Sequence, residues 1–152
     1  MQTIAIGCDH GGFALKGEIM RHLAEKGIEC RDFGCMDTNS VDYPDIALPL
    51  AKAVREDENL LGVLICGTGI GVSLAANKVP GIRAAVCGDP YSARMAREHN
   101  NAQIVCLGAR VIGPSLACEI VDAFLGGAFA GGRHQNRVDK ITAIEQSYHQ
   151  GV

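Results

Sequence analysis

The sequence lacks the features that define several large classes of protein. No apolar run approaches the roughly 20 residues of a membrane-spanning helix. No basic block occurs and the net charge is −3, which argues against a nucleic-acid surface, although a local basic cluster near the C-terminus stays open. With 47% hydrophobic and 20% charged residues, the composition is that of a globular domain, without low-complexity segments.

Paired metal-ligand motifs are also missing. None of the seven cysteines belongs to a CxxC pair and no HExxH occurs, so a zinc site is not expected. The cysteines are scattered, mostly within apolar runs, as small core residues are. A strand is expected to begin at Thr3, which leaves no room for a signal peptide. We therefore expect a cytoplasmic protein with reduced thiols.

Short apolar runs alternate with helical patterns along the 152 residues. Strands are expected at 3–8, 28–33, 60–66, 82–87 and 102–108. Helices are expected at 11–27, 44–56, from the end of a glycine loop to about 79, at 89–99, at 113–125 and, after the joint "GGAFAGG", at about 133–148. The alternation predicts a single α/β domain over 1–152, a doubly wound, Rossmann-like, five-stranded parallel sheet with helices on both faces.

Sheets of this kind bind ligands beyond the C-terminal ends of their strands. One such end is "CGTGIG" at residues 66–71, where a thiol and three glycines join a strand to a helix. A dinucleotide fingerprint would need GxGxxG, but the spacing here is GxGxG, and the candidate ribose partner Asp89 precedes Pro90 as a helix cap would. A thiol phosphatase would need an arginine in the loop behind Cys66 or Cys8, and neither loop has one.

A third interpretation of the loop is an oxyanion site. Glycines allow backbone N–H groups to point at a developing enolate oxygen. Cys66 stands at the start of the expected helix, where thiols ionise more readily, so a thiolate base becomes available. The alternative is an ordinary core cysteine beside a tight turn, and the loop alone does not decide between the two.

Other polar residues are expected near this loop, although each also has a plain structural explanation. Asp9 and His10 follow the first strand and could be a helix cap and a surface histidine. His99 and Asn100 end a helix, where a cationic histidine is favoured anyway. Arg133 and Arg137 are four residues apart and could form a solvated helix face. Together, around one glycine loop with a thiol, they favour a functional site.

The sequence resembles the type B ribose-5-phosphate isomerases, a family shared with the galactose-6-phosphate isomerase subunits. The resemblance is carried by "IAIGCDHGGFALK", "VDYPDIA", "GVLICGTGIGVSLAANKVPGIRAA", "AREHNNAQIVCLGARVIG" and "GRHQNRVDKI", which cover nearly the whole chain in order. Family members with a cysteine base carry it before the glycine loop, where Cys66 stands. Other members place an acidic base further along, and the corresponding "VSLAANK" has no carboxylate here.

The resemblance implies a role for each residue of the site. Cys66 would move a proton between C1 and C2 of the sugar, and the backbone of residues 67–71 would hold the enediolate oxygen. Ring opening would use Thr68 and His99, with Asp9 nearby. The substrate-binding set would be Asp9, His10, Tyr43, Gly67, Thr68, Gly69, Ile70, Gly71, Asn100, Arg110, Arg133 and Arg137, with His10, Arg133 and Arg137 on the phosphate.

We therefore expect a cofactor-free, metal-free aldose–ketose isomerase that interconverts ribose 5-phosphate and ribulose 5-phosphate. A hexose 6-phosphate such as allose or galactose 6-phosphate is the alternative substrate, and a nucleotide-binding module is the alternative from another class. The resemblance also implies a homodimer, or a dimer of dimers, whose pocket is completed by the neighbouring subunit. We expect His99, Asn100 and Arg110 to come from that neighbour.

Overall fold

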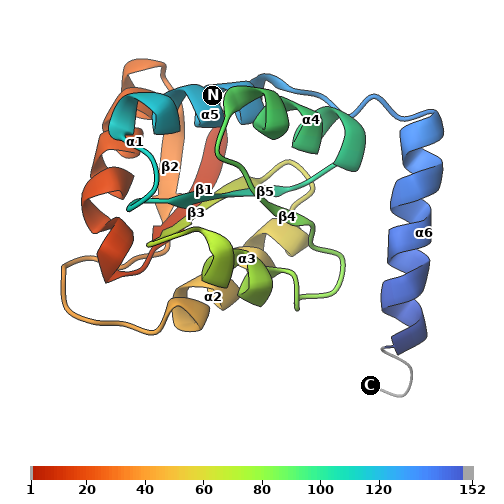
Figure 1. Ribbon diagram of the computed structural model, residues 1–152, viewed down its shortest axis with the longest axis horizontal. Coiled ribbons are helices and arrows are strands. Elements are labelled where there is room, and N and C mark those ends of the chain that lie inside the picture. The colour runs from red at the N-terminus through yellow and green to blue at the C-terminus, as the bar shows by residue number, and fades with distance from the viewer. Residues whose placement is uncertain (1, 149–152) are drawn as a thin grey trace.

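The structure, a computed structural model, describes residues 2–148, and within them a single five-stranded parallel sheet forms the centre (Figure 1). Its strands are β1 (Thr3–Cys8), β2 (Glu29–Asp32), β3 (Leu61–Cys66), β4 (Ala84–Val86) and β5 (Ile104–Gly108). They lie in the order β2-β1-β3-β5-β4, all parallel. The predicted doubly wound α/β fold is confirmed.

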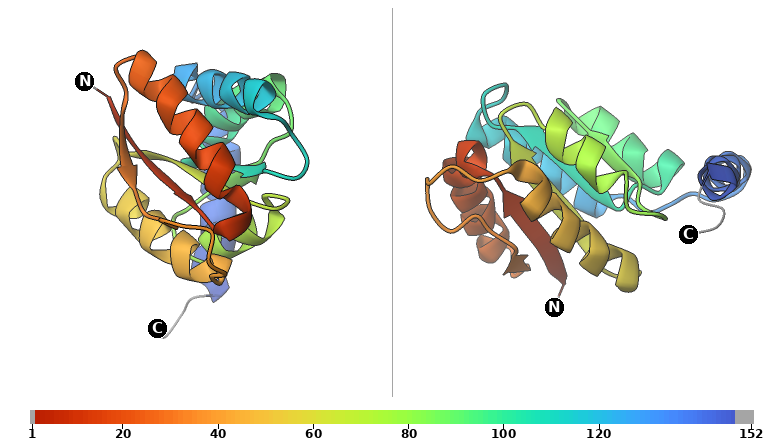
Figure 2. Two further views of the ribbon diagram at one scale, coloured as in Figure 1. Left: turned by 90° about the vertical axis from the view of Figure 1, so that its left-hand side faces the viewer. Right: turned by 90° about the horizontal axis from the view of Figure 1, so that it is seen from below.

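Helices cover both faces of the sheet (Figures 1 and 2). One face carries α1 (Phe13–Glu25), which follows the short 3-10 turn η1 (His10–Gly12), together with α4 (Pro90–Asn100) and α5 (Pro114–Gly126). The other face carries α2 (Tyr43–Glu56) and α3 (Ile70–Ala76). Over residues 2–148, no helix combines the length and the apolar character needed to cross a bilayer.

Successive side chains of a strand point to opposite faces of the sheet, so alternate residues pack into opposite core layers. Val63 and Ile65 of β3 pack into the core beneath α1, α4 and α5. Leu64 and Cys66 of the same strand point the other way and pack beneath α2 and α3. The thiol at the end of β3 therefore faces the helix that follows it, as the "CGTGIG" motif requires.

Several elements are shorter than predicted, and α3 and β4 have a clear structural reason. Helix α3 ends at Ala76, three residues before the expected end at Val79. The reason lies in the next residue, Asn77, whose side chain accepts from the amide of Ala84 at 2.8 Å and donates to its carbonyl at 2.9 Å. These two hydrogen bonds direct the chain into β4, which spans only Ala84–Val86 instead of the predicted 82–87.

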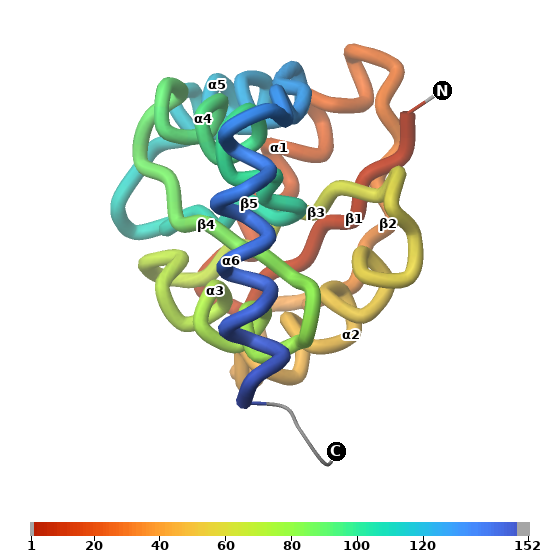
Figure 3. The backbone as a smooth tube through the Cα atoms, turned by 90° about the vertical axis from the view of Figure 1, so that its right-hand side faces the viewer, coloured from red at the N-terminus to blue at the C-terminus, as the bar shows by residue number. Residues whose placement is uncertain are grey.

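The last helix, α6 (Arg133–Tyr148), stands away from the sheet (Figures 1 and 3). The glycine-rich joint before it crosses the end of α4, where the amide of Ala130 donates to the Glu98 carbonyl at 2.9 Å. Val138 is the one buried residue among residues 133–148. Ile141 and Ile144 are 49% and 62% exposed. The joint thus carries the helix off the body of the domain and leaves apolar surface uncovered.

Candidate active site

The centre of the site is the thiol of Cys66, at the carboxyl end of β3. The strand is clamped between β1 and β5, and the amide of Ala109 donates to the Cys66 carbonyl at 2.9 Å. The amide of Gly69 donates to the Cys66 sulfur at 3.2 Å. The side chain is only 5% exposed. This hydrogen bond fixes the Cys66 sulfur at the mouth of the loop, next to the loop amides.

The glycine loop turns tightly and presents its amides. Gly69 has a φ of 81°, and a β-carbon there would lie 2.9 Å from the backbone of Leu107, so no other residue fits without a shift. Within residues 2–148, the amides of Gly67, Thr68 and Gly71 donate to no protein acceptor. Preorganised donors of this kind can stabilise an oxyanion beside the thiol.

Arg110 and Tyr43 form two walls around the loop. The Arg110 amide donates to the Gly67 carbonyl at 3.0 Å, and its guanidinium lies so close that a β-carbon on Gly67 would be 3.3 Å from Nη1. The ring of Tyr43 lies so close to Gly71 that a β-carbon there would be 2.7 Å from it. We expected Arg110 to come from a neighbouring subunit, but it lies on the loop of its own chain, since the β5 end pairs with the β3 end.

Asp9 and His10 occupy the neighbouring strand end. The Asp9 carboxylate accepts from the amide of Gly11 at 2.9 Å, so it does cap the η1 turn. It also faces the glycine loop, because a β-carbon on Gly11 would lie 3.3 Å from Asp9 Oδ1 and 3.8 Å from the Gly67 nitrogen. His10 Nδ1 accepts from the amide of Val41 at 3.2 Å. In the neutral ring this bond places the proton on Nε2, which can then donate to a ligand.

The remaining predicted residues form a second group, which lies near the amino ends of the strands. Helix α4 runs antiparallel to the strands, so its last residues lie near their amino ends. With 11 residues it is about 16 Å long, which separates His99 from Cys66 by the depth of the sheet. Asn100 lines a pocket of about 510 Å³ that lies mainly between residues 77–85 and α6. Arg133 and Arg137 are exposed on the first turns of α6.

His134 also belongs to this second group, and the sequence reasoning missed it. Its ring stacks on that of His99 with centroids 4.1 Å apart and planes 9° from parallel. Desolvation, followed by the nearby His99, Arg133 and Arg137, lowers the pKa of His134. The signal in the sequence was its place in "GRHQNRV", between the two arginines.

Other parts of the chain agree with the interpretation of the loop. Asp89 accepts from the amide and hydroxyl of Ser92 at 2.7 and 2.8 Å, and these bonds lower its pKa, so it caps α4. It is therefore engaged as a cap and not offered to a ribose. Across residues 2–148, no three His, Cys, Asp or Glu side chains come close enough together to hold a metal ion.

A thiol facing preorganised amides, at the carboxyl ends of the strands of a parallel α/β sheet, is an arrangement suited to proton transfer beside a stabilised oxyanion. The chain belongs to the Ribose/Galactose Isomerase family, which it matches over residues 4–141. It is 54% identical to ribose-5-phosphate isomerase B of Escherichia coli, over 96% of this chain and 98% of that protein.

Two further relatives show the range of the similarity. The structure of ribose-5-phosphate isomerase B from Clostridium thermocellum has a TM-score of 0.94 and 56% identity, covering 97% of this chain and 99% of that one. D-erythrulose-4-phosphate isomerase of Pectobacterium atrosepticum is 48% identical over 99% of this chain and all of that protein.

Proposed function

We propose that the protein interconverts ribose 5-phosphate and ribulose 5-phosphate, with Cys66 as the base. The observation that carries the proposal is the Cys66 sulfur, 3.2 Å from the Gly69 nitrogen and beside amides that have no other acceptor in residues 2–148. High identity to the isomerase of Escherichia coli over nearly the whole chain supports the choice of substrate. The reaction belongs with the pentose phosphate interconversions, and we place the enzyme in the cytoplasm.

The proposed chemistry needs only proton transfers. Thr68 and His99, with Asp9 nearby, open the furanose ring to the free aldehyde. The Cys66 thiolate takes the proton from C2, the electrons of that C–H bond form the C1–C2 double bond, and the electrons of the C1 carbonyl bond move to O1, giving a cis-enediolate held by the loop amides. The Cys66 thiol returns the proton to C1 while the carbonyl forms at C2, and the proton of the O2 hydroxyl passes to O1. General acid–base catalysis of this kind contributes about 10²–10⁴-fold.

The two groups of residues support a pocket shared between two copies of the chain. His10 lies at the carboxyl edge of the sheet beside Cys66, and Arg133 and Arg137 lie beyond the opposite edge. A single phosphate cannot reach both in one chain. A second copy, related by a two-fold axis, could supply His99, Asn100 and both arginines to the loop of the first.

Exposed apolar side chains near both groups support such an interface. Ile141 and Ile144 are uncovered on α6, and Leu74 of α3 is 60% exposed. A groove of about 460 Å³ lies between Tyr43 and α3 and borders the glycine loop at Gly71. Association of two chains would remove these surfaces from water and would close a site that is open in the isolated chain.

The test is an assay of ketose appearance over a panel of aldose phosphates, comparing kcat/KM. Ribose 5-phosphate should give the highest value. The panel must include six-carbon and four-carbon sugar phosphates. The family description names galactose, and one relative is named D-erythrulose-4-phosphate isomerase. A higher kcat/KM with either would overturn the substrate. No isomerisation of any sugar, together with a submillimolar thermal-shift response to NAD or ATP, would overturn the class.

A further inference from the structure

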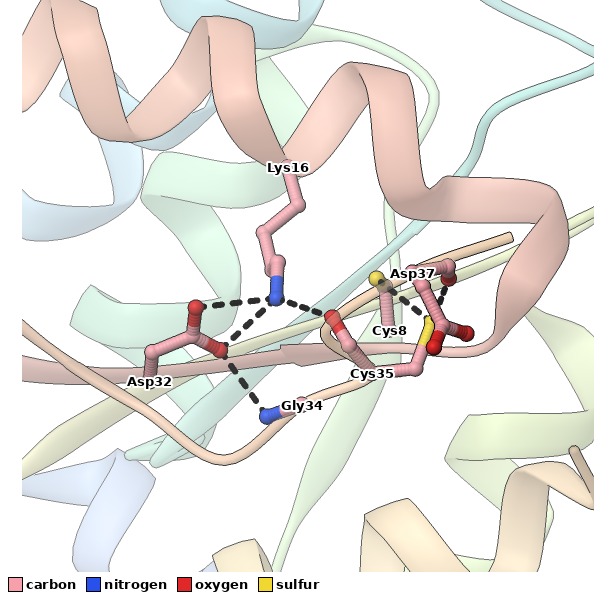
Figure 4. A network of polar contacts seen from close by, with 6 residues as sticks. All are labelled: Cys8, Lys16, Asp32, Gly34, Cys35 and Asp37. Atoms are coloured by element: carbon pink, nitrogen blue, oxygen red, sulfur yellow. Dashed lines mark hydrogen bonds and ion pairs between the residues drawn. The ribbon is translucent and has the colours of Figure 1, made fainter. Parts of the chain in front are cut away.

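Two thiols, those of Cys8 and Cys35, lie next to the proposed site. Cys8 ends β1 immediately before Asp9, and Cys35 lies in the segment 33–42 between β2 and α2, here named the 33–42 loop. Their sulfur atoms are 3.9 Å apart (Figure 4). We propose that Cys8 and Cys35 form a reversible disulfide in the presence of a peroxide, and that this bond locks the 33–42 loop to the end of β1.

The backbone already holds the two cysteines at the spacing of a disulfide. The Cys8 amide donates to the Gly34 carbonyl at 2.7 Å, and the Cys35 amide donates to the Cys8 carbonyl at 2.7 Å. Chains joined in this way run about 4.8 Å apart, which falls within the Cα separations that disulfides span. Rotation of the two side chains is therefore enough to form the bond.

The start of the 33–42 loop is anchored by a buried side chain, and its middle is exposed. The ammonium of Lys16, only 3% exposed, donates to both Asp32 oxygens at 2.8 and 2.9 Å and to the Cys35 carbonyl at 2.6 Å (Figure 4). Beyond this point Met36 is 66% exposed. The thiol of Cys35 donates to the Asp37 carbonyl at 3.2 Å.

The two thiols differ in a way that sets the order of the reaction. Cys35 is 5% exposed and Cys8 is not exposed at all, so a small oxidant reaches Cys35 first. Burial raises the pKa of the Cys8 thiol to about 12, and the Lys16 cation opposes that shift. Cys8 is therefore the resolving thiol, and the neighbouring cation favours its ionisation during the second step.

The reaction balances with hydrogen peroxide as the oxidant. The deprotonated Cys35 sulfur attacks one peroxide oxygen, the O–O bond breaks, and the leaving hydroxide takes up a proton to give water and a sulfenic acid. The Cys8 sulfur then attacks the sulfenic sulfur, the S–S bond forms, the S–O bond breaks and a second water leaves. Two thiols are oxidised to one disulfide, and the peroxide is reduced to two waters.

The 33–42 loop, once held by the disulfide, would lie next to Asp9 and His10 of the proposed site. Its far end contributes the Val41 amide to His10, and its near end would be covalently tied to the residue before Asp9. Closure of the 8–35 segment also restricts the unfolded chain, which stabilises the fold. The oxidised protein should melt about 5–10 °C above the reduced protein.

The experiment treats the full-length protein with hydrogen peroxide, alkylates the remaining thiols under denaturing conditions and digests it with trypsin. Residues 1–16 should appear joined to residues 32–52, two hydrogens lighter than the separate peptides. The melting temperature should rise and return to its first value with dithiothreitol. Cys35→Ser keeps a hydroxyl donor for the Asp37 carbonyl and should show neither effect, while Cys118→Ser should show both.

Two outcomes would overturn the proposal. One is a digest without the joined peptide in which Cys35 or other cysteines carry sulfinic or sulfonic acid. The other is a joined peptide with an unchanged or lower melting temperature. Oxidised and reduced forms of one protein are compared, so poor folding of a variant does not affect the result. Neither readout uses isomerase activity, so failure here is distinct from failure of the proposed function.

Discussion

Among the seven cysteines, Cys66 has the environment of a base. Burial raises the pKa of Cys8, Cys30, Cys87, Cys106 and Cys118, which disfavours their thiolate forms. Cys66 accepts an amide hydrogen bond at the mouth of the glycine loop. A hydrogen-bonded thiolate next to oxyanion donors is what abstraction of a proton beside a carbonyl requires.

Replacement of Cys66 should therefore stop proton transfer without abolishing binding. In Cys66→Ala, kcat should fall by at least about 10²–10⁴-fold, because the base is lost while the amides remain. The measurement is exchange of the substrate C2 proton with solvent deuterium, followed by NMR. A non-reactive sugar-phosphate analogue should still bind, and Cys118→Ala should behave as wild type. Substantial exchange in Cys66→Ala would remove this residue from the mechanism.

The two arginines of α6 should act on binding. Arg133→Ala and Arg137→Ala should each raise KM strongly, because phosphate contacts stabilise the ground and transition states alike. The exposed Arg21 on α1 provides the matched control, and its replacement should leave KM unchanged. Removing the phosphate from the substrate should harm wild type far more than the double mutant. Equal losses in both proteins would mean that the arginines only form a solvated face.

At the scale of elements, the turn from β3 into α3 depends on Gly69. An alanine there must adopt a φ of 81° and place its β-carbon 2.9 Å from the Leu107 backbone. We expect Gly69→Ala to destabilise the fold by about 2–4 kcal/mol. Activity should fall further than stability explains, since the amide that contacts Cys66 moves.

The matched control is Gly17, which lies in α1 with nothing near its missing β-carbon. Gly17→Ala should stabilise the protein by about 0.5–1 kcal/mol, because alanine is the better helix former. Both variants can be compared by urea unfolding. A Gly69→Ala protein as stable and active as Gly17→Ala would refute the need for glycine in the turn.

Much of the architecture could be predicted because each element carries its own local signal. The apolar run before Cys66, the Asp89–Pro90 cap and the glycine-rich joint before Arg133 depend on neighbouring residues alone. The early end of α3 could not be predicted, because it depends on Asn77 reaching Ala84 across a turn. The approach of Cys8 to Cys35 is likewise a tertiary contact between residues 27 apart.

The sequence predicted a site shared between two chains with His99 and Asn100 from the neighbour, but it grouped Arg110 with them and did not assign Arg133 and Arg137 to either chain. All strands are parallel, so a helix between two strands must end at their amino edge, and His99 therefore cannot reach Cys66 in the same chain. The separation of His99 from Cys66 within one chain follows from the direction of α4. Arg110 was misassigned to a neighbour because the pairing of the β3 and β5 ends is not a local feature of the sequence.

At the scale of the whole molecule, the proposed site requires two chains. One chain offers a thiol, an oxyanion loop and His10 at one edge, and a histidine and two arginines at the other. A two-fold dimer would place each group opposite its complement and would make two equivalent sites. The uncovered apolar side chains of α6 would lie in that contact.

Complementation between two inactive variants tests this claim most directly. Cys66→Ala and His99→Ala should each be nearly inactive alone. After equal mixing, unfolding and refolding, random pairing makes about half of the dimers mixed. One site of each mixed dimer carries both lesions and the other carries neither, so the mixture should recover about a quarter of wild-type activity. Activity no greater than that of the separate variants, with mixed dimers verified by distinct tags, would contradict the shared site.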